Sequence, residues 1–298
     1  MLHYQPTPVQ EIHDEILVAA GVRLMVKRED CNHPTVSGNK WWKLKYNLAE
    51  SARGGHSTLL TFGGAYSNHI YAVAAAAREV GLKSIGIIRG EETLPLNATL
   101  SFAKECGMRL HYILRNAYRH KTENASIENL HQLFGDFYLI PEGGTNELAL
   151  QGCEEFASSI LSEIDFDYLC LPVGTGGTMA GIVAGLKGEK PVLGFSSLKG
   201  GVFLEPEIKT MLKGFAPITI KSWRIETTYH FGGYGKSTAE LDDFIFNQWH
   251  KHHIPLDRVY TSKMMFGVYD MIRNNYFDRG STVMLIHTGG LQGRHAIT

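Results

Sequence analysis

The sequence predicts an α/β protein built on two open, mostly parallel sheets. Apolar segments of strand length alternate with helical patterns along the 298 residues, and this alternation is typical of parallel sheets that carry helices on both faces. Seven predicted strands in a chain of this length favour two sheets over one. Because no internal repeat or low-complexity linker marks a boundary, we expect a second domain to be inserted into the first.

Four of the predicted strands lie in the first half of the chain. Residues 58–62 form an apolar run, and the Ala-rich segment 68–81 that follows has the composition of a helix. This segment ends at Gly81, and glycine commonly ends helices. Residues 84–88 form the next apolar run and residues 98–107 the next helical pattern. Two more strands, with a helix between them, complete this half: 109–114 and 137–140.

The second half continues the alternation around a glycine-rich loop. Residues 148–163 have a helical pattern, and the apolar run at 168–173 leads directly into the loop. A further helix, 178–186, begins where the loop ends. Two later apolar runs are also predicted to be strands: 191–196 and 282–287.

Bulk composition excludes several classes of function. The formal net charge is −1, from 29 basic and 30 acidic residues, which argues against a nucleic acid or an anionic membrane as the main partner. No stretch reaches the ~18 apolar residues of a membrane span, and the N-terminal residues do not resemble a signal peptide. The scattered cysteines form no CxxC pair and predict neither a metal site nor a disulfide framework. We therefore expect a cytoplasmic protein.

The glycine-rich loop, Gly174-Thr175-Gly176-Gly177-Thr178, has the pattern of an anion site. A strand, a glycine loop and a helix place backbone N–H groups and the positive end of a helix dipole at one point. A plain strand-to-helix turn is the alternative interpretation. The loop contains no GxGxxG and lacks the lysine of a P-loop, so a monophosphate fits better than a dinucleotide.

Lys40, within Ser37-Gly38-Asn39-Lys40, is the candidate nucleophile. A lone lysine is usually solvated, but Trp41, Trp42 and Leu44 give the following segment a large apolar face, which favours a buried start. Burial lowers the pKa of a lysine. A lysine that attacks a carbonyl group or accepts a proton needs such a lowered pKa, because only the neutral amine can do either. Together with the phosphate loop, Lys40 predicts an internal aldimine with pyridoxal 5'-phosphate, a cofactor that supplies an electron sink.

A second loop, Gly63-Gly64-Ala65-Tyr66-Ser67-Asn68-His69, lies between a predicted strand and the Ala-rich helix. Ser67 and Asn68 are good N-cap residues, which is the structural interpretation. The functional interpretation is that exposed N–H groups at this helix start hold a substrate carboxylate. The two interpretations are compatible. His69 has two possible interpretations: a histidine on the surface of the first helical turn, or an acid/base residue.

These motifs resemble the 1-aminocyclopropane-1-carboxylate (ACC) deaminase / D-cysteine desulfhydrase family. The resemblance covers almost the whole chain in the family's order. It implies a pyridoxal-phosphate enzyme of fold type II, like tryptophan synthase β, and commonly a homodimer. It also implies a large domain, residues 1–43 plus 152–298, and a smaller inserted α/β domain, residues 44–151. The further motifs that carry it are Val26-Lys27-Arg28-Glu29-Asp30, Pro141-Glu142-Gly143-Gly144-Thr145-Asn146, Arg258-Val259-Tyr260-Thr261-Ser262-Lys263-Met264 and His287-Thr288-Gly289-Gly290.

The resemblance also implies roles for single residues. Lys40 is similar to the Schiff-base lysine, and Asn68 to the residue that hydrogen-bonds the ring hydroxyl of the cofactor. Ser67, with the amides around it, resembles the carboxylate-binding and proton-handling serine. Tyr260 resembles the tyrosine that lies against the pyridine ring of the cofactor, and Tyr234 the second active-site tyrosine. Positions 174 to 178 match the phosphate loop, and His69 is assigned to the substrate with Ser67 and Asn68.

Two threonines favour one substrate over another. The deaminase branch has an acidic residue where this chain has Thr261, and an apolar one where it has Thr288, so both resemble the desulfhydrase branch. A carboxylate at this point would hold a proton on the pyridine nitrogen and deepen the electron sink, whereas a neutral hydroxyl suffices when a good leaving group sits on the β-carbon. Trp41 and Trp42 stand where the family has smaller polar or basic residues, near the expected substrate mouth.

We therefore expect α,β-elimination from a small amino acid, D-cysteine, giving pyruvate, ammonia and sulfide. Lys40, or Ser67 or Tyr234 on the other face, removes the α-proton. ACC deamination is the first alternative, and a serine dehydratase or racemase the second. An amino-acid-binding relative without turnover is the non-enzymatic alternative. A nicotinamide-dependent dehydrogenase is disfavoured because its fingerprint is absent.

Overall fold

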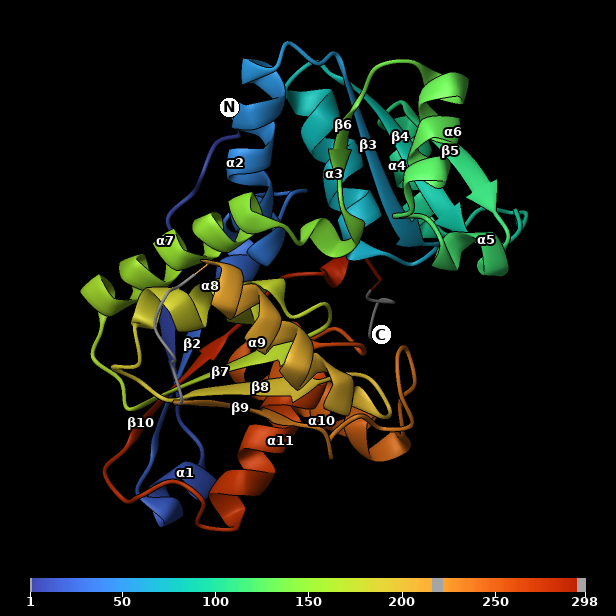
Figure 1. The fold of residues 1–298 in the computed structure, drawn as a ribbon. Coiled ribbons are helices and arrows are strands. Elements are labelled where there is room, and N and C mark those ends of the chain that lie inside the picture. The colour runs from blue at the N-terminus through green and yellow to red at the C-terminus, as the bar shows by residue number, and fades with distance from the viewer. Residues whose placement is uncertain (1, 216–221, 294–298) are drawn as a thin grey trace.

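Two separate sheets organise the chain (Figure 1). The computed structural model describes residues 2–215 and 222–293, and within them a six-stranded and a four-stranded sheet. The strands of the larger sheet are β1 Val9–Ile12, β2 Arg23–Lys27, β7 Tyr168–Val173, β8 Val192–Ser196, β9 Trp223–Glu226 and β10 Thr282–Ile286. The strands of the smaller sheet are β3 Thr58–Gly64, β4 Lys83–Arg89, β5 Met108–Ile113 and β6 Tyr138–Ile140.

The larger sheet has the order β1-β2-β10-β7-β8-β9. Only β1 is antiparallel to its neighbour. Every residue of β8 and β10 is buried, as expected for parallel strands that helices cover on both faces. Strand β7 lies between β10 and β8, so the glycine-rich loop leaves the carboxyl edge near the middle of the sheet. Ligands of open α/β sheets bind at that edge.

The smaller sheet is entirely parallel, with the order β5-β4-β3-β6. Its central strand β3 leads through the Gly63–Ser67 loop into α3, which begins at Asn68. The carboxyl end of β3 thereby presents a second helix N-terminus. In Figure 1 the smaller sheet and its helices, in teal and green, lie above the larger sheet.

Helices connect the strands in both sheets. The α-helices are α1 Glu15–Ala20, α2 Asn39–Arg53, α3 Asn68–Glu79, α4 Ala98–Glu105, α5 Arg115–Arg119, α6 Asn124–Phe134, α7 Glu147–Glu163, α8 Gly177–Leu186, α9 Leu204–Phe215, α10 Ala239–His252 and α11 Thr261–Arg273. The 3-10 turns are η1 Glu29–Cys31, η2 Glu142–Gly144, η3 Gly201–Phe203 and η4 Leu291–Gly293. Within the described residues, no helix is both long and apolar enough to cross a membrane.

The predicted fold class is confirmed: the protein is α/β with two mostly parallel sheets. All four strands of the smaller sheet lie within the predicted segment 44–151, and those of the larger sheet lie outside it. Helix α2 spans the predicted junction at 43/44, α7 spans that at 151/152, and the two helices pack together. Those domain boundaries stay a prediction.

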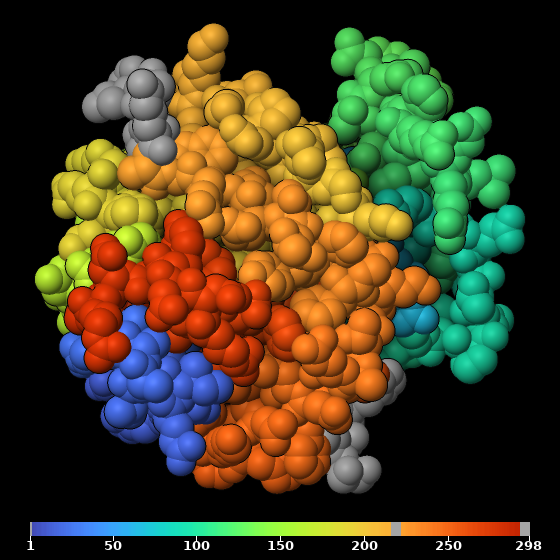
Figure 2. Space-filling model, turned by 90° about the horizontal axis from the view of Figure 1, so that it is seen from below, coloured from blue at the N-terminus to red at the C-terminus, as the bar shows by residue number. Residues whose placement is uncertain are grey.

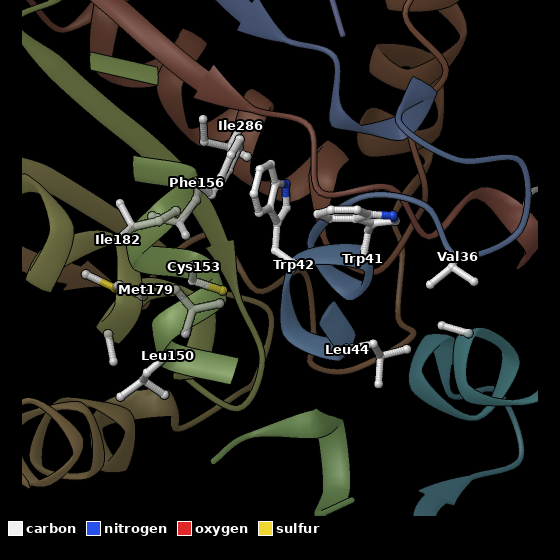
Figure 3. Packing of buried hydrophobic residues seen from close by; sticks show 14 of the residues in the cluster. Val36, Trp41, Trp42, Leu44, Leu150, Cys153, Phe156, Met179, Ile182 and Ile286 are labelled. Atoms are coloured by element: carbon white, nitrogen blue, oxygen red, sulfur yellow. The ribbon is translucent and has the colours of Figure 1, made fainter. Parts of the chain in front are cut away.

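Trp41 and Trp42 lie in the core, not at a substrate mouth. They are 6% and 5% exposed, and Figure 3 shows both indoles among buried apolar side chains. The Trp42 ring stacks on Phe156, with centroids 5.0 Å apart and an angle of 25° between the planes. Their burial confirms the predicted apolar face of this segment, whereas the expectation that they lie near the substrate mouth was wrong. On a helix, side chains that directly follow Lys40 point to other faces than Lys40 does.

Segments from the two ends of the described chain lie side by side. Strand β10 pairs with β2, and Arg279 Nη1 donates to the carbonyl oxygen of Ala19 over 2.9 Å. In Figure 2 the blue surface near the N-terminus adjoins the red surface near the C-terminal end of the described chain. The same view shows an indentation between the yellow-orange surface of the larger-sheet half and the green surface of the smaller-sheet half.

Candidate active site

At the start of α2, the backbone at Gly38 lies directly against the backbone at Thr288. Gly38, the N-cap residue, has a φ of 69°, a value that favours glycine. A Cβ on Gly38 would lie 1.9 Å from the carbonyl oxygen of Thr288. That same oxygen accepts a hydrogen bond from the Asn39 backbone N–H over 3.3 Å. Only glycine at position 38 allows the chain to bring Lys40 and Thr288 this close.

A buried cluster around Glu29 holds the segment before Lys40 in place. Asn32 Nδ2 donates to the Gly38 carbonyl oxygen, and the Gly38 N–H donates to Asn32 Oδ1. Glu29 is fully buried and accepts from Asn32, Thr7, Tyr4 and Trp42. These donors satisfy the buried carboxylate, and a buried polar network whose members are all satisfied favours one arrangement of the segment before Lys40.

The Lys40 side chain is linked to the glycine-rich loop through Asn39. Lys40 Nζ donates to Asn39 Oδ1 over 2.9 Å, and Asn39 Nδ2 donates to Thr178 Oγ1 over 2.8 Å. Burial lowers the pKa of Lys40 to about 8, although Cys153 and Asp257 act in the opposite direction. Compared with the ordinary 10.5, this raises the neutral fraction at pH 7 by about 300-fold. The amine is therefore suited to react with a carbonyl group.

One small cavity brings together three of the predicted site residues. Lys40, Asn68 and Thr288 all line it, together with Ser37, Gly290 and Gln292. These residues come from the start of α2 and the segment just before it, from the start of α3 and from the segment after β10. The cavity therefore lies between the larger-sheet half and the smaller-sheet half of the molecule.

The glycine-rich loop has the geometry of an anion site. Gly176 has a φ of 80° and caps α8 without a side-chain hydrogen bond, so N–H groups at the start of that helix remain available. Gly174 lies against the ring of Tyr260, because a Cβ on Gly174 would be 3.1 Å from its hydroxyl oxygen. Thr175 is exposed and Thr178 is buried.

Lys43 is a buried cation beside this loop that the sequence interpretation missed. It is 2% exposed, and Nζ donates to Thr145 Oγ1 over 2.9 Å. Thr145 in turn shares a 2.8 Å hydrogen bond with Thr175 Oγ1. Within the described residues no carboxylate pairs with Lys43. Burial, and the nearby charge of Lys40, lower the pKa of Lys43 to about 7. A buried lysine without a counter-ion indicates an anion that the protein itself does not supply.

Ser67 caps α3. Its hydroxyl oxygen accepts from the backbone N–H groups of His69 and Ile70 over 3.2 and 3.3 Å. The structural interpretation of Ser67 is therefore confirmed. Within the described part of the chain no hydrogen bond uses the Ser67 hydroxyl proton or the Asn68 backbone N–H. Both donors are thus available to a ligand carboxylate.

His69 is buried, which excludes the surface interpretation. It is 2% exposed and does not line the Lys40 cavity. Thr61 Oγ1 donates to the Ile140 carbonyl oxygen and lies 2.8 Å from His69 Nε2, so Nε2 carries the proton. Burial, with the charges of Lys40 and Lys43, holds the pKa of His69 well below 6.5. His69 is a neutral interior residue, and its assignment to the substrate stays a prediction.

Tyr234 and Tyr260 lie together. Their rings meet edge to face, with centroids 6.0 Å apart. Desolvation raises the pKa of each, although Tyr234 is still 44% exposed, so both phenols keep their protons near neutral pH. Lys263 holds the loop before Tyr234, because its Nζ donates to the carbonyl oxygens of His230 and Gly233 over 2.9 and 2.8 Å.

Thr261 is fully buried and its hydroxyl is already engaged. Its Oγ1 donates to Asp257 Oδ1 over 2.6 Å and accepts from the Asp257 backbone N–H over 3.0 Å. Asp257 also accepts from the backbone N–H groups of Val259, Tyr260 and Thr261. Thr261 therefore retains one lone pair and no free proton. It does not line the Lys40 cavity.

The arrangement combines a reactive amine, an anion site and unclaimed donors. Lys40 has a lowered pKa, and Asn39 links it to the glycine-rich loop. Lys43 places a cation beside that loop. Asn68 and Ser67 add donors at the start of α3. Such a site can hold a phosphorylated aldehyde and a carboxylate side by side.

Comparison with known proteins agrees with this chemistry. The family model described as "Pyridoxal-phosphate dependent enzyme" matches residues 1–289. A "Putative 1-aminocyclopropane-1-carboxylate deaminase" of Thermotoga maritima is 30% identical, over 99% of this chain and 97% of that protein. A mitochondrial "Bifunctional D-cysteine desulfhydrase/1-aminocyclopropane-1-carboxylate deaminase" of Arabidopsis thaliana is 29% identical, over 98% of this chain and 78% of that protein.

A solved structure described as an "ACC deaminase homologue" has the same fold. It superposes with a TM-score of 0.85 at 27% identity, and the match covers 98% of this chain and 92% of that one.

Proposed function

Because this chain belongs to the pyridoxal-phosphate dependent enzymes, in the group whose curated members are named ACC deaminase and D-cysteine desulfhydrase, we propose that it is a lyase acting on D-cysteine. The reaction is an α,β-elimination. D-cysteine and one water give pyruvate, ammonia and hydrogen sulfide. The proton leaves Cα, and sulfide leaves from the β-carbon with the bonding electron pair.

The residues present fit the cofactor of this family. Its phosphate would lie at Gly174–Thr178, with Lys43 as the cation that the buried site otherwise lacks. Lys40 would hold it through its amine. When bound, pyridoxal phosphate supplies an aldehyde for an amino group and a ring that delocalises the negative charge left on Cα.

The protein's own groups would bind the substrate and move its proton. Ser67 and the free N–H of Asn68 bind the substrate carboxylate at the positive end of α3. The Lys40 amine, neutral in a larger fraction because burial lowers its pKa to about 8, takes the α-proton from one face. If the α-proton instead lies on the opposite face of the substrate, Ser67 or Tyr234 would remove it.

Thr261, which stands where the resemblance puts the partner of the ring nitrogen, is the residue that carries the choice of substrate. A hydroxyl whose one proton is already donated to Asp257 cannot also donate a hydrogen bond to a ring nitrogen, and a neutral hydroxyl does not hold a proton on that nitrogen as a carboxylate would. The pyridine ring of the cofactor is then less electron-withdrawing than it would be beside a carboxylate. Elimination of a good leaving group, such as a thiolate, tolerates this. ACC has no such leaving group, so opening its cyclopropane ring depends more strongly on electron withdrawal by the cofactor ring.

ACC deaminase is the second candidate function. It is supported by the names of the relatives in Thermotoga maritima and Arabidopsis thaliana. The Arabidopsis protein is named for both activities, so one scaffold of this group hosts both.

Product analysis with the purified, cofactor-loaded enzyme tests the proposal. The substrates are D-cysteine, L-cysteine, D-serine and ACC, and the products measured are sulfide, pyruvate and 2-oxobutyrate. We expect sulfide and pyruvate in equal amounts from D-cysteine. Turnover of ACC without turnover of D-cysteine would refute the choice, and pyruvate from serine alone would indicate a dehydratase.

A further inference from the structure

The segment after β10 reaches across to the smaller-sheet half and contacts Asn68. Gln292, in the short turn η4, donates through Nε2 to Asn68 Oδ1. Gly290 packs against the same side chain, since a Cβ there would lie 2.2 Å from Asn68 Nδ2. Gln292, Gly290 and Asn68 all line the Lys40 cavity. The Asn68 carboxamide is therefore held from the larger-sheet half of the molecule.

The direction of this hydrogen bond decides what Asn68 offers to the cavity. A carboxamide has one end that accepts and one that donates. When Gln292 occupies Oδ1, the donor end Nδ2 remains, and Nδ2 makes no hydrogen bond with any residue in the ranges 2–215 and 222–293. Without Gln292 the carboxamide can turn over and present its oxygen instead.

We propose that Gln292 is a positioning residue that fixes the Asn68 carboxamide with Nδ2 toward the cavity, so that this site selects a hydrogen-bond acceptor. On the proposed function, on which this inference rests, that acceptor is the ring oxygen of pyridoxal phosphate. A donor at this point favours the ionised form of the oxygen. Gln292 thus acts on the cofactor only through Asn68.

Three substitutions of Gln292 separate the possible directions. Gln292→Lys can only donate, so it keeps the present direction and stays closest to wild type. Gln292→Met neither donates nor accepts and leaves Asn68 free to turn. Gln292→Glu can only accept, so it pairs with Nδ2 and turns the oxygen of Asn68 toward the cavity. Gln132→Glu, on an exposed position of α6, is the matched control for the change of charge.

The readouts are the dissociation constant of pyridoxal phosphate and the pH at which the visible absorbance of the bound cofactor changes. For Gln292→Glu we expect roughly tenfold weaker binding and a transition about one pH unit higher. Gln292→Met should lie between Glu and Lys. The inference is wrong if Gln292→Lys weakens cofactor binding more than Gln292→Glu does. It is also wrong if all three variants bind the cofactor as wild type does.

A double-mutant cycle with Asn68→Ala distinguishes this inference from a general effect of charge. In the Asn68→Ala background, Gln292→Glu should cause no further change, because its target is gone. A further loss of the same size would mean that Gln292 does not act through Asn68.

The same cycle separates failure of this inference from failure of the proposed function. Asn68→Ala without effect on the absorbance would contradict the placement of the cofactor. An effect of Asn68→Ala without any effect of Gln292 would contradict the role of Gln292 alone.

Discussion

Lys43→Met tests the claim that a buried, unpaired lysine is kept for an anion. Lys43 is 2% exposed, and within the described residues its Nζ makes one hydrogen bond, to Thr145. Methionine has a similar length and apolar stem but no charge. We expect the variant to be more stable than wild type without ligand and to bind pyridoxal phosphate more weakly.

The magnitude follows from the pKa of Lys43. A decrease from 10.5 to about 7 corresponds to at most about 5 kcal/mol at about 1.4 kcal/mol per tenfold change in proton affinity. The lost bond to Thr145 and imperfect packing reduce this, so we expect a gain of about 1–3 kcal/mol at pH 6.

The sign of the pH dependence is fixed by which state binds more protons. The pKa of Lys43 is lower in the folded state, so between pH 7 and 10.5 the unfolded state holds more protons and wild-type stability rises with pH. The advantage of Lys43→Met should therefore be largest below pH 7 and vanish above pH 10.5.

Urea unfolding at several pH values measures the stability, and titration with pyridoxal phosphate measures the affinity. Loss of a charge-assisted hydrogen bond to phosphate should weaken binding by roughly 10–100-fold. Lys45→Met, on the same helix, is the control, because Lys45 is partly exposed and pairs with Glu155. A variant that is less stable at every pH, or that binds the cofactor as well as wild type, would refute the reasoning.

Three further predictions concern other parts of the site. Capture of the cofactor by Lys40 should accelerate as pH rises to about 8, because burial lowers the pKa of this amine; stopped-flow absorbance measures it, and a rate independent of pH would contradict it. Lys263→Met should make the loop before Tyr234 more susceptible to limited proteolysis, since two carbonyl groups lose their donor; an unchanged cleavage pattern would count against this. Trp42→Phe should cost about 1–3 kcal/mol in urea unfolding, because buried Glu29 loses one donor, and a neutral effect would show that the remaining donors suffice.

Local sequence patterns predicted the elements near the site well. The apolar run at 168–173 coincides with β7, and the N-cap at Ser67 with the start of α3. Both depend on residues adjacent in the chain. The strand β2 and the helix α11 were not predicted, although both pack in the core of the larger sheet. Segment α11 contains glycine, serine and lysine among its apolar residues, and its burial comes from packing against distant elements.

The site was less predictable because its contacts join residues that are far apart in sequence. Lys40 and the glycine-rich loop were expected to meet, and Asn39 does bond to Thr178 across 139 positions. Nothing in the local pattern marks Lys43, which lies one turn after Lys40 on α2 and resembles a solvated lysine until Thr145 is placed beside it. Gln292 likewise has no motif of its own. The chemical roles of the predicted residues stay predictions.

Lys40 and Lys43, both on α2, need opposite protonation states when the cofactor phosphate is bound. Lys40 must be neutral to bond an aldehyde, whereas Lys43 must be charged to hold a phosphate. Without a ligand, burial lowers the pKa of both amines, so their own environment favours the neutral form of each and does not assign them opposite charges. A phosphate beside Lys43 raises the pKa of that amine, and a charged Lys43 one turn away opposes a proton on Lys40. An anion at the glycine-rich loop would therefore separate the protonation states of the two amines, with Lys43 charged and Lys40 neutral.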